Sequence, residues 1–230
     1  MVFYDKYSRS AFSVDNVIFG FDGEALKVLL IKRNSKPYEE FWALPGELVK
    51  EGEDLDAAPM RVLKELTGLH NVYLEQVHTF GKVDRHPKGR VITVAYYSLV
   101  NIHKVYTDTT HLSQEVDWVD VREIKALAFD HYEIMSTCLR KLKAHLRFRP
   151  IGFELLEEKF TLTELQALYE AVLERELDKR NFRKKVLSMK ILEDIQEYQQ
   201  GVAHRPAKLF KFNKEKYVES QKEGFIFDVL

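Results

Sequence analysis

Residues 179–190 form the part of the chain best equipped for chemistry, with six basic side chains and no acidic one. Arginine binds guanine edges, asparagine binds adenine and lysine binds backbone phosphate, so this composition suits DNA recognition. At about 100° per residue, Phe182, Val186 and Met189 form one apolar stripe of a helix. The polar side opposite this stripe carries Arg180, Asn181, Arg183 and Lys184. Lys179 flanks the apolar stripe. The pattern predicts a helix that packs through one face and contacts DNA through the other.

The loop at 199–208, QQGVAHRPAK, carries three more basic side chains, namely His204, Arg205 and Lys208. It is either a plain surface hairpin or a wing, from which Arg205 could enter a narrow minor groove. The predicted DNA contacts are therefore Lys179, Arg180, Asn181, Arg183, Lys184, His204, Arg205 and Lys208.

Residues 44–69, LPGELVKEGEDLDAAPMRVLKELTGL, resemble the Nudix box, G-x5-E-x7-R-E-U-x-E-E-x-G-U with U aliphatic. The matching positions are Glu53, Arg61, Leu63, Glu65, Gly68 and Leu69. Glu47, Val62 and Leu66 replace the first glycine and two glutamates of the motif. The resemblance implies a Nudix fold whose metal positions are degenerate, with only Glu53 and Glu65 kept.

In Nudix enzymes, helix glutamates hold a divalent cation on the substrate pyrophosphate. Positions 62, 65 and 66 share one helical face, and here that face reads Val, Glu, Leu. A hard cation needs several oxygen ligands, so we expect no metal site and weak or absent metal-dependent hydrolysis. Pro59 falls inside the helical span and puts that helix in doubt. By spacing alone, Arg61 and Glu65 would be an ordinary surface ion pair.

Five side chains are candidates to bind a small-molecule effector. Trp42 lies beside the box loop and either packs there or encloses a ligand, and Glu47 lies in the loop itself. Asp84, Arg85 and His86 lie in a polar turn that could equally be simply exposed to solvent. The histidines show no repeated ligand spacing and Cys138 is the one cysteine, so we expect no zinc site and no cofactor.

The elements that must position these residues indicate two domains of α+β class. Residues 14–33 contain two apolar runs around Asp22-Gly23, which predicts a hairpin. Further strands are expected at 72–80, 91–100 and 115–121, and helices at 55–67 and 129–146. Together they predict an α+β domain over residues 1–147, for which the Nudix resemblance implies an α/β/α sandwich.

Pro150 and Gly152 interrupt the helical pattern and indicate a linker at 148–153. A helix with a capping box at Thr161 and Glu164 follows, then the basic helix and two strand-like runs around the 199–208 loop. This order predicts a winged helix over 148–220. Residues 221–230 lack a clear period and are expected to be a docked or disordered tail.

The whole arrangement resembles the Nudix-related transcriptional regulators, namely the NrtR group and its sugar-responsive AraR relatives. FTLTELQALYEA at 160–171, LDKRNFRKK at 177–185 and RPAKLFKF at 205–212 carry this resemblance. It implies a homodimer whose Nudix-like domain senses an effector and whose winged helices release a palindromic operator. The eroded box favours the sugar branch, with a pentose such as L-arabinose as effector, over the branch that responds to ADP-ribose.

The composition sets limits on the other readings. Among 230 residues, 35 Lys and Arg balance 36 Asp and Glu, so DNA binding must come from a local patch. We find no secretory or membrane-spanning pattern and expect a cytoplasmic protein. Two alternatives remain: a metal-dependent pyrophosphatase that uses Glu53, Glu65 and either Glu47 or Glu51, and a protein-interaction module that never touches DNA.

Overall fold

The computed structural model describes residues 10–70, 72–103, 115–201, 205–223 and 225–228. The chain divides into two compact units, the first built mainly from residues before Leu142 and the second from Leu142 onward. The units are described separately.

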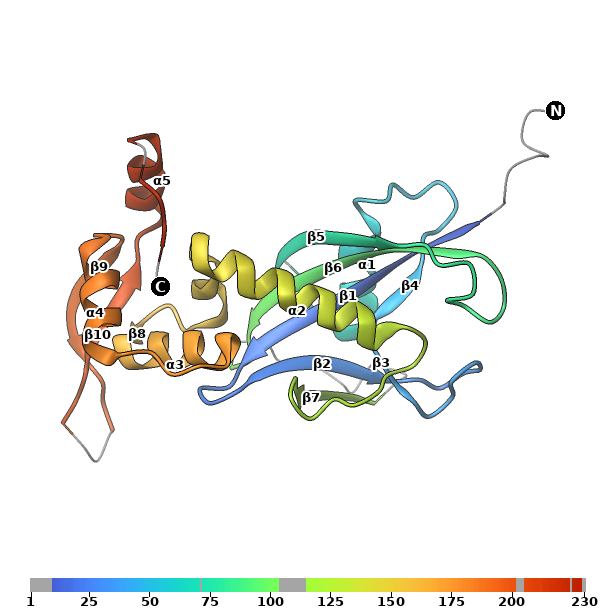
Figure 1. Cartoon of the computed structure of the whole chain (residues 1–230), viewed down its shortest axis with the longest axis horizontal. Coiled ribbons are helices and arrows are strands. Elements are labelled where there is room, and N and C mark those ends of the chain that lie inside the picture. The colour runs from blue at the N-terminus through green and yellow to red at the C-terminus, as the bar shows by residue number, and fades with distance from the viewer. Residues whose placement is uncertain (1–9, 71, 104–114, 202–204, 224, 229–230) are drawn as a thin grey trace. The chain divides into compact units, whose positions relative to one another are not determined.

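Within the described residues, the first unit contains one seven-stranded sheet (Figure 1). Strands β3-β2-β1-β6-β5 lie in this order, β4 pairs with β1, and β7 pairs with β2. Their bounds are β1 Ala11–Phe21, β2 Leu26–Lys32, β3 Trp42–Ala43, β4 Gly46–Leu48, β5 Tyr73–Phe80, β6 Val91–Asn101 and β7 Val116–Asp120. The predicted longer strands are confirmed, whereas the short β3 and β4 carry too few residues to show a period of two.

The turn between β1 and β2 forms as the Asp-Gly pair predicts. The Asp22 carboxylate accepts hydrogen bonds from the backbone N–H groups of Glu24 and Ala25 at 3.0 and 2.8 Å. Gly23 has a φ of 102°, a value that side chains disfavour. The local chemistry of two residues therefore sets this hairpin.

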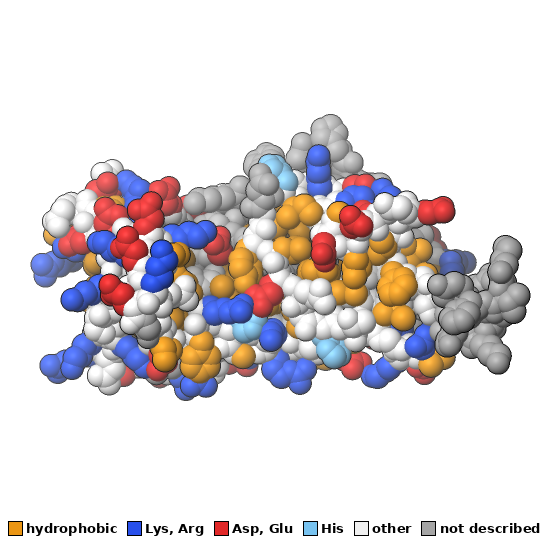
Figure 2. Space-filling view, turned by 90° about the horizontal axis from the view of Figure 1, so that it is seen from above, with side chains coloured by type: hydrophobic (Ala, Val, Ile, Leu, Met, Phe, Trp, Pro, Cys, Tyr) orange, Lys and Arg blue, Asp and Glu red, His pale blue; other side chains and the backbone are white. Residues whose placement is uncertain are grey.

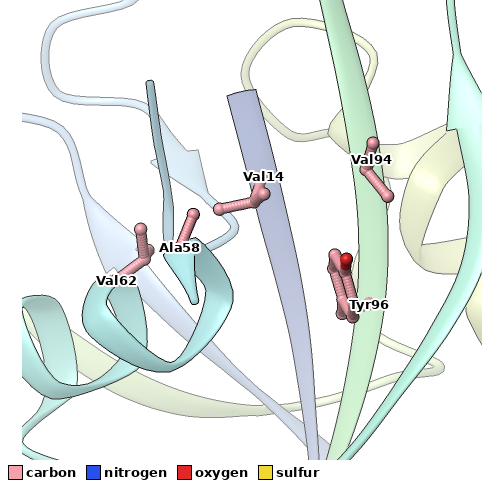
Figure 3. Close-up of a cluster of buried hydrophobic side chains, with 5 residues drawn as sticks. All are labelled: Val14, Ala58, Val62, Val94 and Tyr96. Atoms are coloured by element: carbon pink, nitrogen blue, oxygen red, sulfur yellow. The ribbon is translucent and has the colours of Figure 1, made fainter. Parts of the chain in front are cut away.

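Helix α1, Ala58–Thr67, is the helix expected at 55–67, shortened at its start. Pro59 lies in its first turn, where an N–H group has no partner within the helix, so the proline is tolerated there. Ala58 and Val62 pack against Val14 of β1, and Val94 and Tyr96 of β6 belong to the same buried cluster (Figure 3).

Helix α2, His131–Phe148, runs along the sheet in Figure 1. Ile134 and Cys138 are fully buried, and the Cys138 thiol lies 3.9 Å from the Tyr96 carbonyl oxygen of β6. Cys138 is therefore a core residue, as its place on the apolar stripe predicts. With α1 and α2 packed on the sheet, the first unit has the predicted α+β class.

The second unit has the order of a winged helix. Its elements are β8 Phe160–Thr161, α3 Leu162–Leu173, α4 Lys179–Ser188, β9 Leu192–Tyr198, β10 Lys208–Phe212 and α5 Lys214–Lys222. Strands β8, β10 and β9 form a small sheet in that order. The capping box is confirmed, because Thr161 Oγ1 accepts from the Glu164 N–H at 3.1 Å and the Glu164 carboxylate accepts from the Thr161 N–H at 2.6 Å.

Residues 148–153, expected to be a linker, instead form the end of α2 and the beginning of a 3-10 helix. They overlap the 3-10 helix η2, Pro150–Leu155, whose Ile151, Gly152 and Leu155 are buried. A Cβ atom on Gly152 would lie 2.8 Å from Leu146, so close packing explains this glycine. Proline and glycine serve packing here rather than flexibility.

The C-terminal segment adds a helix that the sequence pattern does not reveal. Asn213 caps α5 by accepting a hydrogen bond from the Lys216 N–H at 2.9 Å. Beyond α5, the Phe225 and Phe227 rings lie edge-on to Tyr217, and Phe227 is 3% exposed. Of the two expected states of the tail, the described residues 225–228 show the docked one.

On the face shown in Figure 2, acidic and basic side chains are interspersed over the second unit, and hydrophobic side chains gather over the first. Charges of one sign therefore do not dominate this face, in keeping with the net charge of -1. No helix in the described ranges is long and apolar enough to cross a membrane.

Candidate effector cavity and DNA-binding surface

The retained charged residues of the box bind one another. Arg61 donates to Glu53 Oε2 and to Glu65 Oε2, both at 2.9 Å, and the Lys50 ammonium lies 2.9 Å from Glu65 Oε1. Hydrogen bonds from Arg61 lower the pKa of Glu53 to about 2. Both carboxylates are therefore ionised and already paired with cations.

Two of the three altered positions of the box, 62 and 66, carry apolar side chains that pack in the protein. Val62 is fully buried in the α1 cluster (Figure 3). Leu66 is partly buried and packs against the same cluster. Across the described residues, no group of three or more His, Cys, Asp or Glu side chains could hold a metal ion. This donor set does not fit the divalent cation that a Nudix fold implies.

An open cavity of about 520 Å³ lies in the first unit. It is lined by residues of β1 and β4, the loop after β2, the turn before β6, and the segment that leads into α2. Leu66 of α1 also lines it, so the cavity lies beside the box.

The cavity contains a buried polar network. Arg85 donates to both carboxylate oxygens of Asp130, at 2.7 and 2.8 Å, and its Nη2 lies 3.8 Å from Asp15. The Arg85 side chain is only 4% exposed. His131 Nδ1 accepts a hydrogen bond from the Leu44 N–H at 3.0 Å, and its Nε2 lies 3.7 Å from Asp15. The polar turn at 84–86 is therefore partly buried, because the Arg85 side chain points into the protein and lies near the Asp130 and Asp15 carboxylates.

Burial controls the protonation of this network. It raises the pKa of Asp15 to about 7, although Arg85 opposes this shift. It also lowers the pKa of His131 to about 3, so the imidazole is neutral near pH 7. Gly46 approaches Asp15 so closely that a Cβ atom there would collide with the carboxylate. Gly46, the glycine of the LPG sequence, therefore has to lack a side chain because the Asp15 carboxylate occupies that space.

The remaining lining is rich in cations. Arg33, Lys36, Lys88 and Arg90 line the cavity, against one further carboxylate, Glu47. The net positive charge of this lining suits an anionic ligand.

An aromatic group stands beside these cations. Phe129 adopts a left-handed φ of 54°, uncommon for a bulky residue. The Arg33 guanidinium lies 4.8 Å from the Phe129 ring centre, and His86 stacks on this ring at 5.1 Å. The cavity therefore offers flat aromatic surface as well as positive charge.

The structure brings together part of the predicted effector set. Glu47, Arg85 and His86 line the cavity, whereas Trp42 and Asp84 are not among its described lining residues. Trp42 belongs to β3, and Asp84 is exposed. Arg33, Lys88, Arg90 and Phe129 were missed, because they come from separate segments. The basic run KGR at 88–90 was the one local signal.

Helix α4 presents the face that its sequence predicts. Phe182 and Val186 are buried at 4% and 2% exposure. Arg180, Asn181 and Lys184 are exposed, as is Lys179 in the first turn. This helix follows α3 across a short turn, as the second helix of a helix-turn-helix does.

Two basic residues of α4 are held by neighbours. Arg183 is partly buried and donates to Thr163 Oγ1 of α3 at 2.9 Å. Lys185 lies 3.1 Å from the Asp228 carboxylate of the C-terminal segment. Arg183 therefore braces α4 against α3, and a DNA contact by it stays a prediction.

The loop between β9 and β10 is closed by a hydrogen bond from the Gln199 N–H to the Ala207 carbonyl at 2.9 Å. Arg205 is exposed, whereas Lys208 lies in β10 and pairs with Asp194. His204 lies outside the described residues. Of the three predicted wing contacts, Arg205 is the one that the structure leaves open to solvent.

Comparison with known proteins assigns both units. The NUDIX domain model matches residues 9–140, and the NrtR DNA-binding winged helix domain model matches residues 152–212. The chain is 34% identical to the ADPR-responsive transcriptional repressor NtrR of Acinetobacter baylyi over 215 residues, 92% of this chain and 85% of that protein. The chain belongs to the NrtR family of Nudix-related transcriptional regulators.

Solved NrtR structures agree with this assignment. NrtR of Shewanella oneidensis complexed with a 27mer DNA superposes with a TM-score of 0.79 and 28% identity, covering 94% of this chain and 97% of that chain. The NUDIX domain of the same NrtR complexed with ADP ribose superposes with a TM-score of 0.54 and 29% identity, covering 60% of this chain and 92% of that chain. The predicted fold and family are confirmed.

The comparisons do not support the sugar branch that the eroded box favours. Those reported above lie on the ADP-ribose side of the NrtR family. Two of the three box substitutions, Val62 and Leu66, lie on α1, and the third, Glu47, lies on β4. Glu47 and Leu66 also line the cavity. Erosion of the box does not by itself select the sugar branch.

Proposed function

We propose that this NrtR-family protein is a transcriptional repressor that binds operator DNA through α4 and the β9–β10 loop and releases it when ADP-ribose binds the first unit. The exposed face of Arg180, Asn181 and Lys184 supports DNA reading, since it combines base-reading and phosphate-binding side chains. The A. baylyi relative, named as an ADPR-responsive repressor, supports the effector.

The charge of the cavity is the observation that carries the choice of effector. L-Arabinose is neutral and would leave the cationic lining without a counter-charge. ADP-ribose carries a diphosphate for the cations and an adenine for aromatic surface such as Phe129 and His86. An anionic nucleotide therefore fits these residues better than a free pentose.

Hydrolysis of that ligand is not part of the proposal. Glu53 and Glu65 are paired with Arg61, and positions 62 and 66 offer no oxygen ligand. We expect ADP-ribose to remain intact after incubation with the protein and Mg²⁺, as followed by chromatography of the nucleotide. Release of AMP that disappears in Glu65→Gln would instead establish the pyrophosphatase alternative.

We further propose that the protein acts as a homodimer on a palindromic operator. Two-fold symmetric repressors place two recognition helices on half-sites that mirror each other. Hydrophobic side chains gathered on one face of the first unit supply surface that a second copy could cover (Figure 2).

Fluorescence anisotropy on DNA from the region upstream of the gene tests this function. We expect specific binding that weakens steeply between two salt concentrations and is released by ADP-ribose. Release by L-arabinose alone would restore the sugar branch. Failure to bind DNA at low salt would favour the protein-interaction alternative.

A further inference from the structure

Arg90 is a cation without a described counterpart. It stands at the start of the cavity wall formed by β6, and its Nε and Nη1 atoms are buried without a hydrogen-bond partner. A buried guanidinium donor left unpaired costs free energy, so native structures nearly always satisfy it. Its backbone is fixed, because the Arg90 carbonyl accepts from the Ala11 N–H at 3.0 Å.

Neighbouring cations are held at the same cavity. Lys88 donates to the Lys36 carbonyl oxygen at 3.0 Å, which leaves two ammonium protons for another acceptor. Arg33 donates through Nε to the Pro37 carbonyl oxygen at 3.0 Å while it lies over Phe129. Backbone carbonyls therefore fix these two cations in place without neutralising their charge.

The carboxylates of the cavity, Glu47 and Asp15, act on Arg33 and compensate the four cations only in part. Asp15 faces Arg85 and His131, and Glu47 accepts a hydrogen bond from the Leu48 N–H at 2.9 Å. Four cations thus meet one free carboxylate charge at most, and two donors of Arg90 are unsatisfied. An anion with several acceptor oxygens would complete the site.

We propose that Arg90, with Lys88 and Arg33, forms a phosphate-binding subsite that holds the diphosphate of the nucleotide effector without a metal ion. This inference rests on the proposed function for the identity of the effector. The guanidinium fork matches phosphate oxygens in a bidentate manner, which a lysine cannot reproduce. In this subsite, the three side chains supply the positive charge that a bound divalent cation would otherwise bring to the diphosphate.

Isothermal titration of the full chain tests the subsite. The probes are ADP-ribose, inorganic pyrophosphate and ribose, each with Mg²⁺ and with EDTA. We expect the parent protein to bind ADP-ribose with the same affinity in EDTA as in Mg²⁺, and to bind pyrophosphate with the same affinity in both conditions. We expect no binding of ribose.

The Arg90→Met variant should lose at least about tenfold in affinity for both phosphate ligands, because a charged hydrogen-bond partner is removed. Arg90→Lys keeps the charge but not the fork and should recover only part of the loss. Lys82→Met is the matched control, since Lys82 is exposed, pairs with Glu133 and does not line the cavity. Unchanged circular dichroism would show that each variant folds.

The outcomes separate the two proposals. Binding that requires Mg²⁺, or that is equal in Arg90→Met and the parent, would overturn the subsite and leave the repressor function standing. Pyrophosphate binding that depends on Arg90, without any binding of ADP-ribose, would support the subsite and refute the proposed effector. Absence of binding by both phosphate ligands would refute both.

Discussion

Arg180 and Lys184 lie on the same exposed side of α4 but offer different chemistry to DNA. Arg180→Ala should reduce discrimination between operator and unrelated DNA by about 1–3 kcal/mol, because arginine reads base edges. Lys184→Ala should weaken binding to all sequences alike and lower the slope of log affinity against log salt by about 1. Anisotropy titrations on both DNAs measure these effects.

Lys222→Ala is the control for this pair, because Lys222 is exposed on α5, away from α4 in the sequence. It should leave both affinities near those of the parent. An Arg180→Ala variant that selects the operator as well as the parent does would refute the assignment of α4 as the reading helix.

Asp15 predicts a pH dependence of stability. Its pKa is about 7 in the folded protein, above the ordinary value of 3.8, so between these values the folded state binds more protons than the unfolded state. The stabilisation is full below about pH 4 and is lost as the pH rises through 7. Relative to Asp15→Asn, the parent should therefore lose a few kcal/mol between pH 4 and pH 8.

Urea unfolding of the parent and of Asp15→Asn across this range measures the difference. His131 acts in the opposite direction, since its lowered pKa removes stability as the pH falls below about 6.5. His131 lies 3.7 Å from Asp15, so the difference between the two proteins reports Asp15 together with its contact with His131. Parallel stability curves would mean that Asp15 does not titrate in this range.

Helix α1 uses positions 62 and 66 for packing. Val62→Glu should destabilise the protein by about 3 kcal/mol or more, because it buries a carboxylate among apolar side chains. Leu66→Glu should cost less, since Leu66 lines the open cavity. Urea unfolding measures the free energy of unfolding of the two variants. Equal losses would contradict the prediction that position 62 is the more tightly packed of the two.

The C-terminal segment is expected to stabilise the winged helix unit. Phe227→Ala removes a ring that is 3% exposed and should cost about 3 kcal/mol. Ile226→Ala, at a side chain that is 78% exposed, is the neighbouring control. Hydrogen exchange over residues 205–228 should accelerate in the first variant only, and equal exchange would show that the tail contributes nothing.

The whole molecule must couple the two units if it is a ligand-controlled repressor. Whatever factor ADP-ribose takes from operator affinity, operator DNA must take from ADP-ribose affinity. Titrating nucleotide into the protein alone and into its DNA complex measures this factor. Equal affinity in both titrations would show that the nucleotide does not control DNA binding.

Sequence alone determined the elements whose cause is local. Asp22-Gly23 sets a turn, Thr161 and Glu164 set a cap, and the period of Phe182 and Val186 sets the buried face of α4. Each depends on residues a few positions apart, where spacing translates directly into geometry. The resemblance to Nudix and NrtR proteins also rests on short sequence motifs of this kind.

Tertiary structure decided the rest, because its partners are distant in sequence. Arg85 meets Asp130, 45 positions away, and the cavity lining joins β1, β4 and β6 with the segment before α2. No periodicity links Arg33 to Arg90. Fold follows from patterns that repeat along the chain, whereas the charge of a cavity is a sum over segments that only folding brings together.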